Sequence, residues 1–177
     1  NLSLARAIFV NRCDRPDADY DVTLEGLREH YGNNLGAVTI PMGTGDAFGG
    51  VIDVVHMKAR PLEGGKPVVT DVPAEYKDTA DEARANLTEL VVEADDELMM
   101  RYLEGGEITQ AELEGLLGKA MAERVFVPVF AGSCVREEGL FSLMDAIVGW
   151  FPTMADFGRI PLVNGEQLDI SPDDDRP

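Results

Sequence analysis

A short apolar run, Ala7–Val10, constrains this chain most, because it ends abruptly in the polar tetrapeptide Asn11-Arg12-Cys13-Asp14. Short apolar strands that are bounded by turn-forming residues are typical of a sheet covered on both faces. Sheets of this kind place ligands at the carboxyl ends of their strands. We therefore expect a buried strand that delivers a recognition loop, with Asn11 and Asp14 as the candidate functional residues.

A second apolar run, Val125–Phe130, ends in the polar turn Gly132-Ser133-Cys134. Pro128 lies inside this run and cannot donate a hydrogen bond to a neighbouring strand, which weakens the strand or places Pro128 at a bulge or an edge. A long stretch of other structure separates the two runs. Two such strands can still bring their loops to one edge of the same sheet.

Helical and strand-like patterns alternate along the chain, which favours the α/β class. Apolar residues at helical spacing predict one helix that ends at Gly32 and another that starts near Pro73. The second pattern is long, and we expect a break near Asp95-Asp96. A capping-box sequence at Thr109 opens a further helix, and a last helix ends at Pro152.

A β-rich stretch covers residues 37–41 and 49–59, with a Gly-rich turn at Gly43–Asp46 between them. This turn has neither the GxxxxGK[ST] nor the GxGxxG pattern, so a hairpin or bulge is the better interpretation than a phosphate loop. Residues 160–177 are rich in Pro, Gly and Asp, which predicts a linker or tail.

The 33 acidic residues outnumber 15 Lys and Arg, and the formal net charge is −18. Such a surface repels a phosphate backbone, so we expect no direct nucleic-acid contact from this chain. The acidic helix faces, such as Asp95-Asp96-Glu97, are either solvated surface or a partner surface. The sequence shows neither a membrane span nor a signal peptide, and we expect a cytoplasmic protein with no membrane partner.

Cys13 and Cys134 form no CxxC pair, which argues against a zinc cage or a redox motif, and we expect no metal site. His30 and His56 stand alone in the sequence and are interpreted as surface or boundary residues. If the two polar loops meet, Cys13 and Cys134 lie near each other.

The two loops together have the chemistry that reads guanine. The Asp14 carboxylate can accept two parallel N–H bonds from the base, a donor pair that adenine does not present, and a matched polar site penalises the wrong base. Asn11 can bridge the loop backbone and the base, and the guanidinium of Arg12 can lie across the ring. A backbone N–H near Cys134 can donate to the base oxygen.

These residues carry a family resemblance. The segment Phe9–Arg15 resembles the NKxD guanine-specificity motif of translational GTPases, and Gly132-Ser133-Cys134 is similar to their second guanine loop. The chain between the two loops resembles the insertion of elongation factor G, and its end resembles the last GTPase helix and the link to the next domain. The stretches that carry this likeness are Pro41–Gly43, Phe48–Val54, Val72–Tyr76, Asp96–Gly105, Leu143–Ile147, Phe151-Pro152 and Pro172–Pro177.

The resemblance implies part of a P-loop-type GTPase domain, with parallel strands and flanking helices, plus an inserted α+β subdomain. Residues 1–36 and 124–159 would be the carboxyl-terminal half of the GTPase domain, 37–123 the inserted subdomain, and 160–177 a linker toward a second, barrel domain. It also implies five guanine-binding residues and no catalytic residue in this chain. The five are Asn11, Arg12, Asp14, Ser133 and Cys134.

Two residues depart from the family pattern, because Arg12 stands where Lys is usual and Cys134 where Ala is usual. This difference indicates a divergent elongation factor G-like paralogue. The segment Asp46–Gly49 spells DxxG but follows the guanine motif instead of preceding it, and we interpret it as coincidence.

The resemblance implies that the intact protein binds GTP and GDP and hydrolyses GTP on the ribosome to support translocation. The phosphate loop and the Mg²⁺ ligands are absent from these residues, so we expect the fragment alone to hold no nucleotide and to be inactive. Two alternatives stay open. One is a non-catalytic binding module whose residues 37–123 dock to the ribosomal stalk protein; the other is an unrelated acidic α/β domain with a chance NRCD motif.

Overall fold

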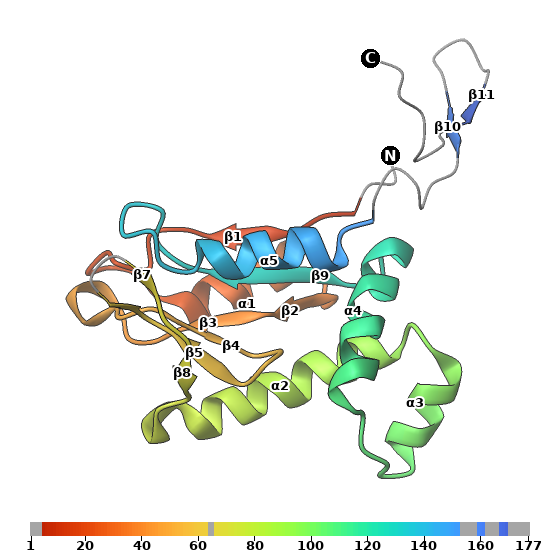
Figure 1. Cartoon of the computed structure of the whole chain (residues 1–177), viewed down its shortest axis with the longest axis horizontal. Helices are drawn as coiled ribbons and strands as arrows, with labels where there is room; N and C mark the ends of the chain where they lie inside the picture. Colours follow the sequence, from red (N-terminus) through yellow and green to blue (C-terminus); the bar gives the residue numbers. More distant parts are fainter. Residues whose placement is uncertain (1–4, 64–65, 153–158, 162–166, 170–177) are drawn as a thin grey trace.

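Strand β9 (Val127–Ala131) pairs on both sides and forms the centre of a three-stranded parallel sheet, with β1 (Ile8–Val10) on one side and β2 (Leu35–Ala37) on the other. The computed structural model describes residues 5–63, 66–152, 159–161 and 167–169 (Figure 1). All five residues of β9 are buried. The continuous apolar character of this run therefore matches a strand covered on both faces.

Pro128 lies in this central strand, so the prediction of a bulge or an edge is wrong. Pro128 is opposite Gly36 on β2, whereas the pairing with β1 starts only at Val129. The Val127 amide donates to the Asn34 carbonyl on the β2 side at 2.9 Å. Successive amides of a strand point to opposite sides, so the Pro128 nitrogen faces the β1 side, before the ladder with β1 begins. The missing N–H therefore removes no ladder hydrogen bond.

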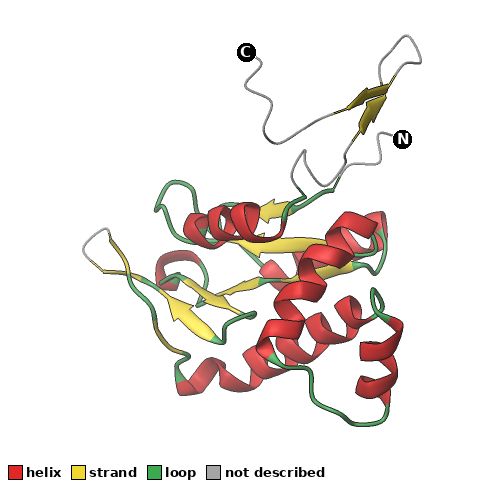
Figure 2. Ribbon diagram, turned by 45° about the vertical axis from the view of Figure 1, so that its right-hand side comes forward, coloured by secondary structure: helices red, strands yellow, loops and turns green. Residues whose placement is uncertain are grey.

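Helix α1 (Tyr20–Tyr31) ends at Gly32, as the sequence predicts. The Asp19 side chain accepts from the Val22 amide at 3.0 Å and caps the start of the helix. Gly32, at φ +102°, ends it. Figure 2 shows helices on both sides of the strands, as expected for parallel pairing.

A separate antiparallel sheet has the strand order β3-β4-β5-β8. The predicted β-rich stretch and its hairpin are confirmed, because β3 and β4 pair around the 3₁₀ turn η1. The bounds are β3 (Thr39–Pro41), η1 (Gly45–Ala47), β4 (Val51–Asp53), β5 (Lys58–Arg60) and β8 (Thr70–Asp71), with a small hairpin of β6 (Leu62–Glu63) and β7 (Lys66–Pro67).

The long helical pattern breaks where the sequence predicts. The Asp95 side chain accepts from the Leu98 amide at 3.2 Å and starts a new helix. The capping box is also present: Thr109 accepts from the Glu112 amide, and the Glu112 carboxylate accepts from the Thr109 amide at 2.9 Å. The helices are η2 (Ala74–Tyr76), α2 (Lys77–Val92), α3 (Asp96–Leu103) and α4 (Gln110–Glu123).

Helix α5 (Leu140–Trp150) runs alongside the parallel sheet (Figure 1). Ser142 and Ala146 are its buried residues, whereas Phe141, Met144 and Val148 are exposed. The predicted linker 160–177 lies mostly outside the described residues. Its described part contributes to a hairpin of β10 (Arg159–Pro161) and β11 (Gln167–Asp169).

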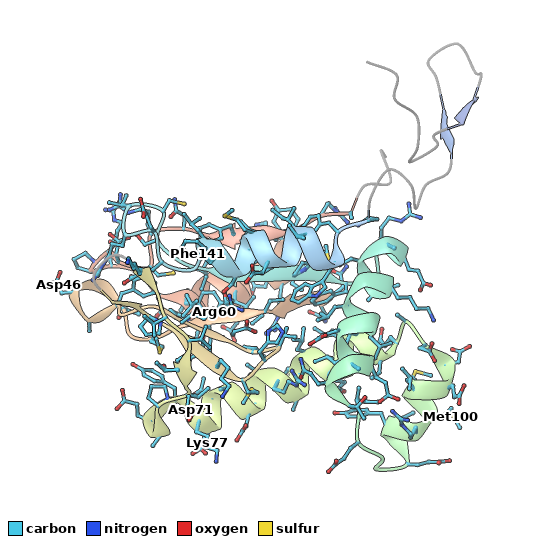
Figure 3. All side chains as sticks on the ribbon, viewed as in Figure 1. Asp46, Arg60, Asp71, Lys77, Met100 and Phe141 are labelled. Carbon is cyan, nitrogen blue, oxygen red and sulfur yellow. The ribbon has the colours of Figure 1, made fainter. Side chains whose placement is uncertain are left out.

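Arg60 joins the antiparallel sheet to α5. Its guanidinium pairs with Asp53 at 2.9 Å and with Asp145 on α5 at 2.7 Å (Figure 3). His56 stands alone in the sequence, but its Nδ1 lies 2.9 Å from Asp53 Oδ2, which accepts a hydrogen bond from the ring. Asp53 is buried, and a buried carboxylate is stable when it is paired and hydrogen-bonded in this way.

The described residues have the predicted α/β class, with one parallel sheet, one antiparallel sheet and flanking helices. The domain boundaries at 36–37 and 123–124 stay a prediction. None of the described helices combines the length and the apolar character that crossing a lipid bilayer requires.

Thr39 binds the first strand of the antiparallel sheet to the end of β9. Its buried hydroxyl accepts from the Ala131 amide at 2.8 Å and donates to the Ala131 carbonyl at 3.4 Å. The hydroxyl of Tyr20 on α1 donates to the Thr39 carbonyl at 3.1 Å. Three elements, α1, β3 and β9, therefore meet at Thr39, whose partner Ala131 directly precedes the second polar loop.

Replacing Thr39 with Val keeps the shape of the side chain but removes the hydroxyl partner of a buried amide. We expect Thr39→Val to lower the free energy of unfolding by about 1–3 kcal/mol, as an unsatisfied buried donor does. Urea denaturation followed by circular dichroism measures the change.

Thr88→Val is the matched control, because Thr88 is also buried but its hydroxyl only donates to the Arg84 carbonyl within α2. This variant leaves no amide without a partner, so its loss should be smaller. Equal losses in the two variants would contradict the role of Thr39.

Candidate functional site

The polar loops that follow β1 and β9 lie at the same end of the parallel sheet and are joined by side-chain hydrogen bonds (Figure 1). Asn11 Oδ1 accepts from the Cys134 amide at 3.0 Å. Ser133 Oγ donates to Asp14 Oδ1 at 2.6 Å, although these two residues are 119 positions apart in the sequence. The five predicted site residues are therefore brought to one place, with Arg12 between the two acceptors.

Asn11 organises the first loop. Its Oδ1 also accepts from the Arg12 amide at 2.8 Å, so one side-chain oxygen binds the backbone of both loops. Arg12 has φ +67°, in the left-handed region that most non-glycine residues avoid. The Asn11 hydrogen bonds stabilise this conformation and turn the chain toward Asp14.

Asp14 is the carboxylate that accepts hydrogen bonds from both loops. Its Oδ1 accepts from Ser133 and from Arg12 Nε, the latter at 3.2 Å. The Ser133 hydrogen bond, helped by the charge of Arg12, holds the pKa of Asp14 below its usual value. Among the described residues, no hydrogen bond reaches Oδ2, so this oxygen of an ionised carboxylate is available to a ligand donor.

The second loop fixes the direction of the Ser133 proton. The Arg136 amide donates to Ser133 Oγ at 3.3 Å, so the hydroxyl accepts on one side and directs its own proton to Asp14. Ser133 and Glu138 exchange two backbone hydrogen bonds, at 2.9 and 3.1 Å. Gly139 closes the turn at φ +84°, and a Cβ there would collide with the Ala131 carbonyl oxygen.

The backbone amide of Cys134 already has a hydrogen-bond partner within the protein. It donates to Asn11, so a base oxygen placed near Cys134 would have to share this donor or take another amide of the loop. The sequence-based interpretation assigned a nearby amide to the base oxygen and did not foresee the hydrogen bond to Asn11.

The two cysteines differ in exposure. The Cys13 amide donates to the Gly132 carbonyl at 3.1 Å, so the loops adjoin as expected. The Cys13 thiol is buried and donates weakly to the Val10 carbonyl at 3.6 Å, and burial raises its pKa. Cys134 is exposed. Both are free thiols, and the burial of Cys13 disfavours a disulfide between them.

A hollow of about 260 Å³ opens beside the first loop, between Arg12, Tyr20 and Thr44. Asp14, Ser133 and Cys134 do not line it. The hollow is therefore not the place where the five predicted residues meet, since only Asn11 and Arg12 of these five line it.

The described residues contain no group of three or more His, Cys, Asp or Glu side chains that could hold a metal ion. The loop carboxylate Asp14 is instead surrounded by a hydroxyl and a guanidinium. The open Oδ2 of Asp14 can accept from an N–H group, whereas a guanidinium beside the carboxylate does not fit Mg²⁺, which needs several oxygen ligands around it.

Three supporting residues were missed in the sequence. Arg136 acts through its backbone amide, which carries no sequence signal, and Glu138 acts in the same way. Thr39 is far from both loops along the chain. Its one available signal was a polar residue within a β-branched apolar stretch.

The chain is similar to a protein of Thermus thermophilus whose crystal structure is known. The two are 32% identical with a TM-score of 0.79, and the match covers 89% of this chain and 24% of that chain. This chain therefore spans about a quarter of that protein's length. The similarity shows a shared fold over most of the chain. No protein-family model matches the sequence.

Replacing Ser133 with Ala removes the main cause of the lowered Asp14 pKa. We expect Ser133→Ala to raise the pKa of Asp14 toward its usual value, because the ionised form loses a hydrogen bond. The ¹³C chemical shift of the Asp14 carboxyl, followed against pH by NMR, measures this.

Asp71 is the internal control. Its pKa is also lowered, but by a hydrogen bond from Lys58 on another strand. The Asp71 titration should be the same in both proteins. An Asp14 titration that does not move in Ser133→Ala would contradict the assigned hydrogen bond.

Proposed function

We propose that this chain is the guanine-reading part of an elongation factor G-like translational GTPase. In this proposal it combines the carboxyl-terminal half of a P-loop-type GTPase domain with an inserted α+β subdomain. The observation that carries the proposal is the junction of the two loops, in which Asn11 binds Cys134 and Ser133 binds Asp14. Loops after neighbouring parallel strands meet in any such sheet, but a chance NRCD motif would not be expected to form both of these side-chain hydrogen bonds with the second loop.

The base would be read by the Asp14 carboxylate. Oδ1 is oriented by Ser133 and Arg12, and Oδ2 is open to the N–H groups on one edge of guanine. Asp14 is ionised at neutral pH, as an Asp with a pKa at or below its usual value is, so it accepts hydrogen bonds and does not donate one. The side chain of Arg12 is half-exposed, which allows its guanidinium to move from Asp14 onto the ring of a bound base.

Binding and hydrolysis of the phosphates belong, in this proposal, to residues outside this chain. The sequence contains no GxxxxGK[ST] motif. Phosphoryl transfer depends on positioning and on charge stabilisation by such a loop and Mg²⁺. The intact protein would use GTP hydrolysis on the ribosome, in the cytoplasm, to support translocation.

A second candidate function is docking to the ribosomal stalk protein through residues 37–123. The observation that favours it is the surface of α3, where Met100 and Leu103 are exposed beside acidic residues such as Asp96 and Glu97 (Figure 3). Exposed apolar side chains rimmed by charge are typical of protein interaction sites.

The guanine assignment is tested by Asp14→Asn in the full-length protein. This variant replaces one acceptor oxygen with a donor, which suits xanthine better than guanine. We expect GTP affinity to fall about 10- to 100-fold, because a hydrogen bond to a charged group contributes about 1.5–3 kcal/mol, and xanthosine triphosphate to become the preferred ligand. Isothermal titration calorimetry measures both affinities.

Asp17→Asn is the matched control for this experiment. Asp17 belongs to the same segment and pairs with Arg15, but its side chain is 74% exposed, against 13% for Asp14. Its replacement should leave both affinities unchanged. GTP affinity that survives Asp14→Asn would overturn the guanine site.

Docking to the stalk is tested by titrating stalk protein into the ¹⁵N-labelled chain. We expect amide shifts in α3 and its neighbours, and weaker binding by Leu103→Ser. The control Val22→Ser removes a similarly exposed apolar side chain, 65% exposed against 72%, from α1. Shifts that are absent from α3, or equal effects of both variants, would contradict this surface.

A further inference from the structure

The turn Thr44–Phe48, which joins β3 to β4, contacts both polar loops although it belongs to neither. The Gly45 amide donates to the Cys13 carbonyl at 3.1 Å, within the tetrapeptide that carries Asp14. On the other side, the guanidinium of Arg136 lies 5.9 Å from the centre of the Phe48 ring. The turn is therefore in contact with the first loop through its backbone and with the second through an aromatic side chain.

The contact with the first loop requires glycine. Gly45 has φ +58°, and a Cβ there would lie 3.1 Å from Pro16 Cα. Both the backbone conformation and the close approach are available to glycine and strained for other residues. A side chain at this position would therefore push the backbones of the turn and of the first loop apart.

The contact with the second loop leads to Asp14 in three steps. Phe48 is buried and presents its ring to the Arg136 guanidinium. The amide of Arg136 donates to Ser133 Oγ, and Ser133 donates to Asp14. A cation near an aromatic ring is attracted to it, so Phe48 restrains the loop position from which the Arg136 amide reaches Ser133.

We propose that the Thr44–Phe48 turn is a positioning element of the base site, in which Phe48, acting through Arg136 and Ser133, sets how strongly Asp14 prefers guanine. This inference rests on the proposed function. Phe48 itself does not touch the base. Its effect reaches the contacts that Asp14 makes, because the hydrogen bonds from the Arg136 amide through Ser133 end at that carboxylate.

The test compares GDP with IDP, whose base lacks the exocyclic amine, in the full-length protein. The ratio of the two affinities isolates the contact of Asp14 with that amine. Phe48→Leu keeps an apolar side chain but removes the ring, and we expect it to lower the GDP/IDP ratio roughly 3- to 10-fold, in line with the loss of a cation–π contact. Phe48→Tyr keeps the ring and should retain the ratio.

Phe126→Leu is the matched control, since Phe126 and Phe48 are both 1% exposed, but Phe126 precedes β9 at the end of the strand opposite the loops. We expect Phe126→Leu to lower the melting temperature and to leave the ratio unchanged. A GDP/IDP ratio that is unchanged in Phe48→Leu, or lowered equally in Phe126→Leu, would overturn the inference.

A surface variant makes the result independent of any folding defect at Phe48. The Arg136 Nε also lies 3.6 Å from the carboxylate of the buried Glu138 in the same loop. Arg136→Met removes the cation from both contacts and should lower the ratio, while Arg136→Lys keeps a cation and should restore it. Failure of the proposed function is distinguishable, because the wild-type protein would then show no preference for GDP over IDP. A wild-type preference that Arg136→Met leaves intact would overturn this inference alone.

Discussion

The parallel pairing of β9 with β1 on one side and with β2 on the other is the constraint on which the rest of the structure depends. The register places Val10 opposite Ala131, so both strands end at the same level and both polar loops start side by side. Thr39 then binds the last residue of β9 through its hydroxyl. A shift of this register would separate Asp14 from Ser133 and remove the candidate site.

The candidate site combines a hydrogen bond and an ion pair on one carboxylate, because Asp14 accepts from Ser133 at 2.6 Å and pairs with Arg12 at 3.2 Å. Ser133 supplies a short hydrogen bond, and the Arg136 amide ensures that the Ser133 proton points to Asp14. The Ser133 hydrogen bond and the charge of Arg12 lower the pKa of Asp14, although its surroundings also desolvate it, which acts in the opposite direction. These contacts favour the ionised form, and no hydrogen bond from the described residues reaches Oδ2.

Predictions that rest on local chemistry agree with the structure. The end of α1 at Gly32, the helix start at Asp95 and the capping box at Thr109 each depend on hydrogen bonds within one turn, so their signals are complete in a few neighbouring residues. The prediction for Pro128 was wrong because it assumed that every residue of a central strand is paired on both sides. Pro128 lies before the point where the ladder with β1 begins, and this point depends on the register of two distant segments. Helix α5 gives a second example. The spacing of its apolar residues predicts an apolar face, but it does not show that Met144 on this helix is exposed.

The sequence by itself determined that two apolar strands end in polar loops and that these loops contain an amide, a carboxylate, a guanidinium and a hydroxyl. Only the tertiary structure decided that Asn11 binds the Cys134 amide and that Ser133 binds Asp14, in the second case between residues 119 positions apart. It also decided that Gly45 and Phe48 lie against both loops. The physical reason is that hydrogen bonds through backbone amides and contacts between distant segments depend on strand register and packing, which leave no pattern in the order of side chains.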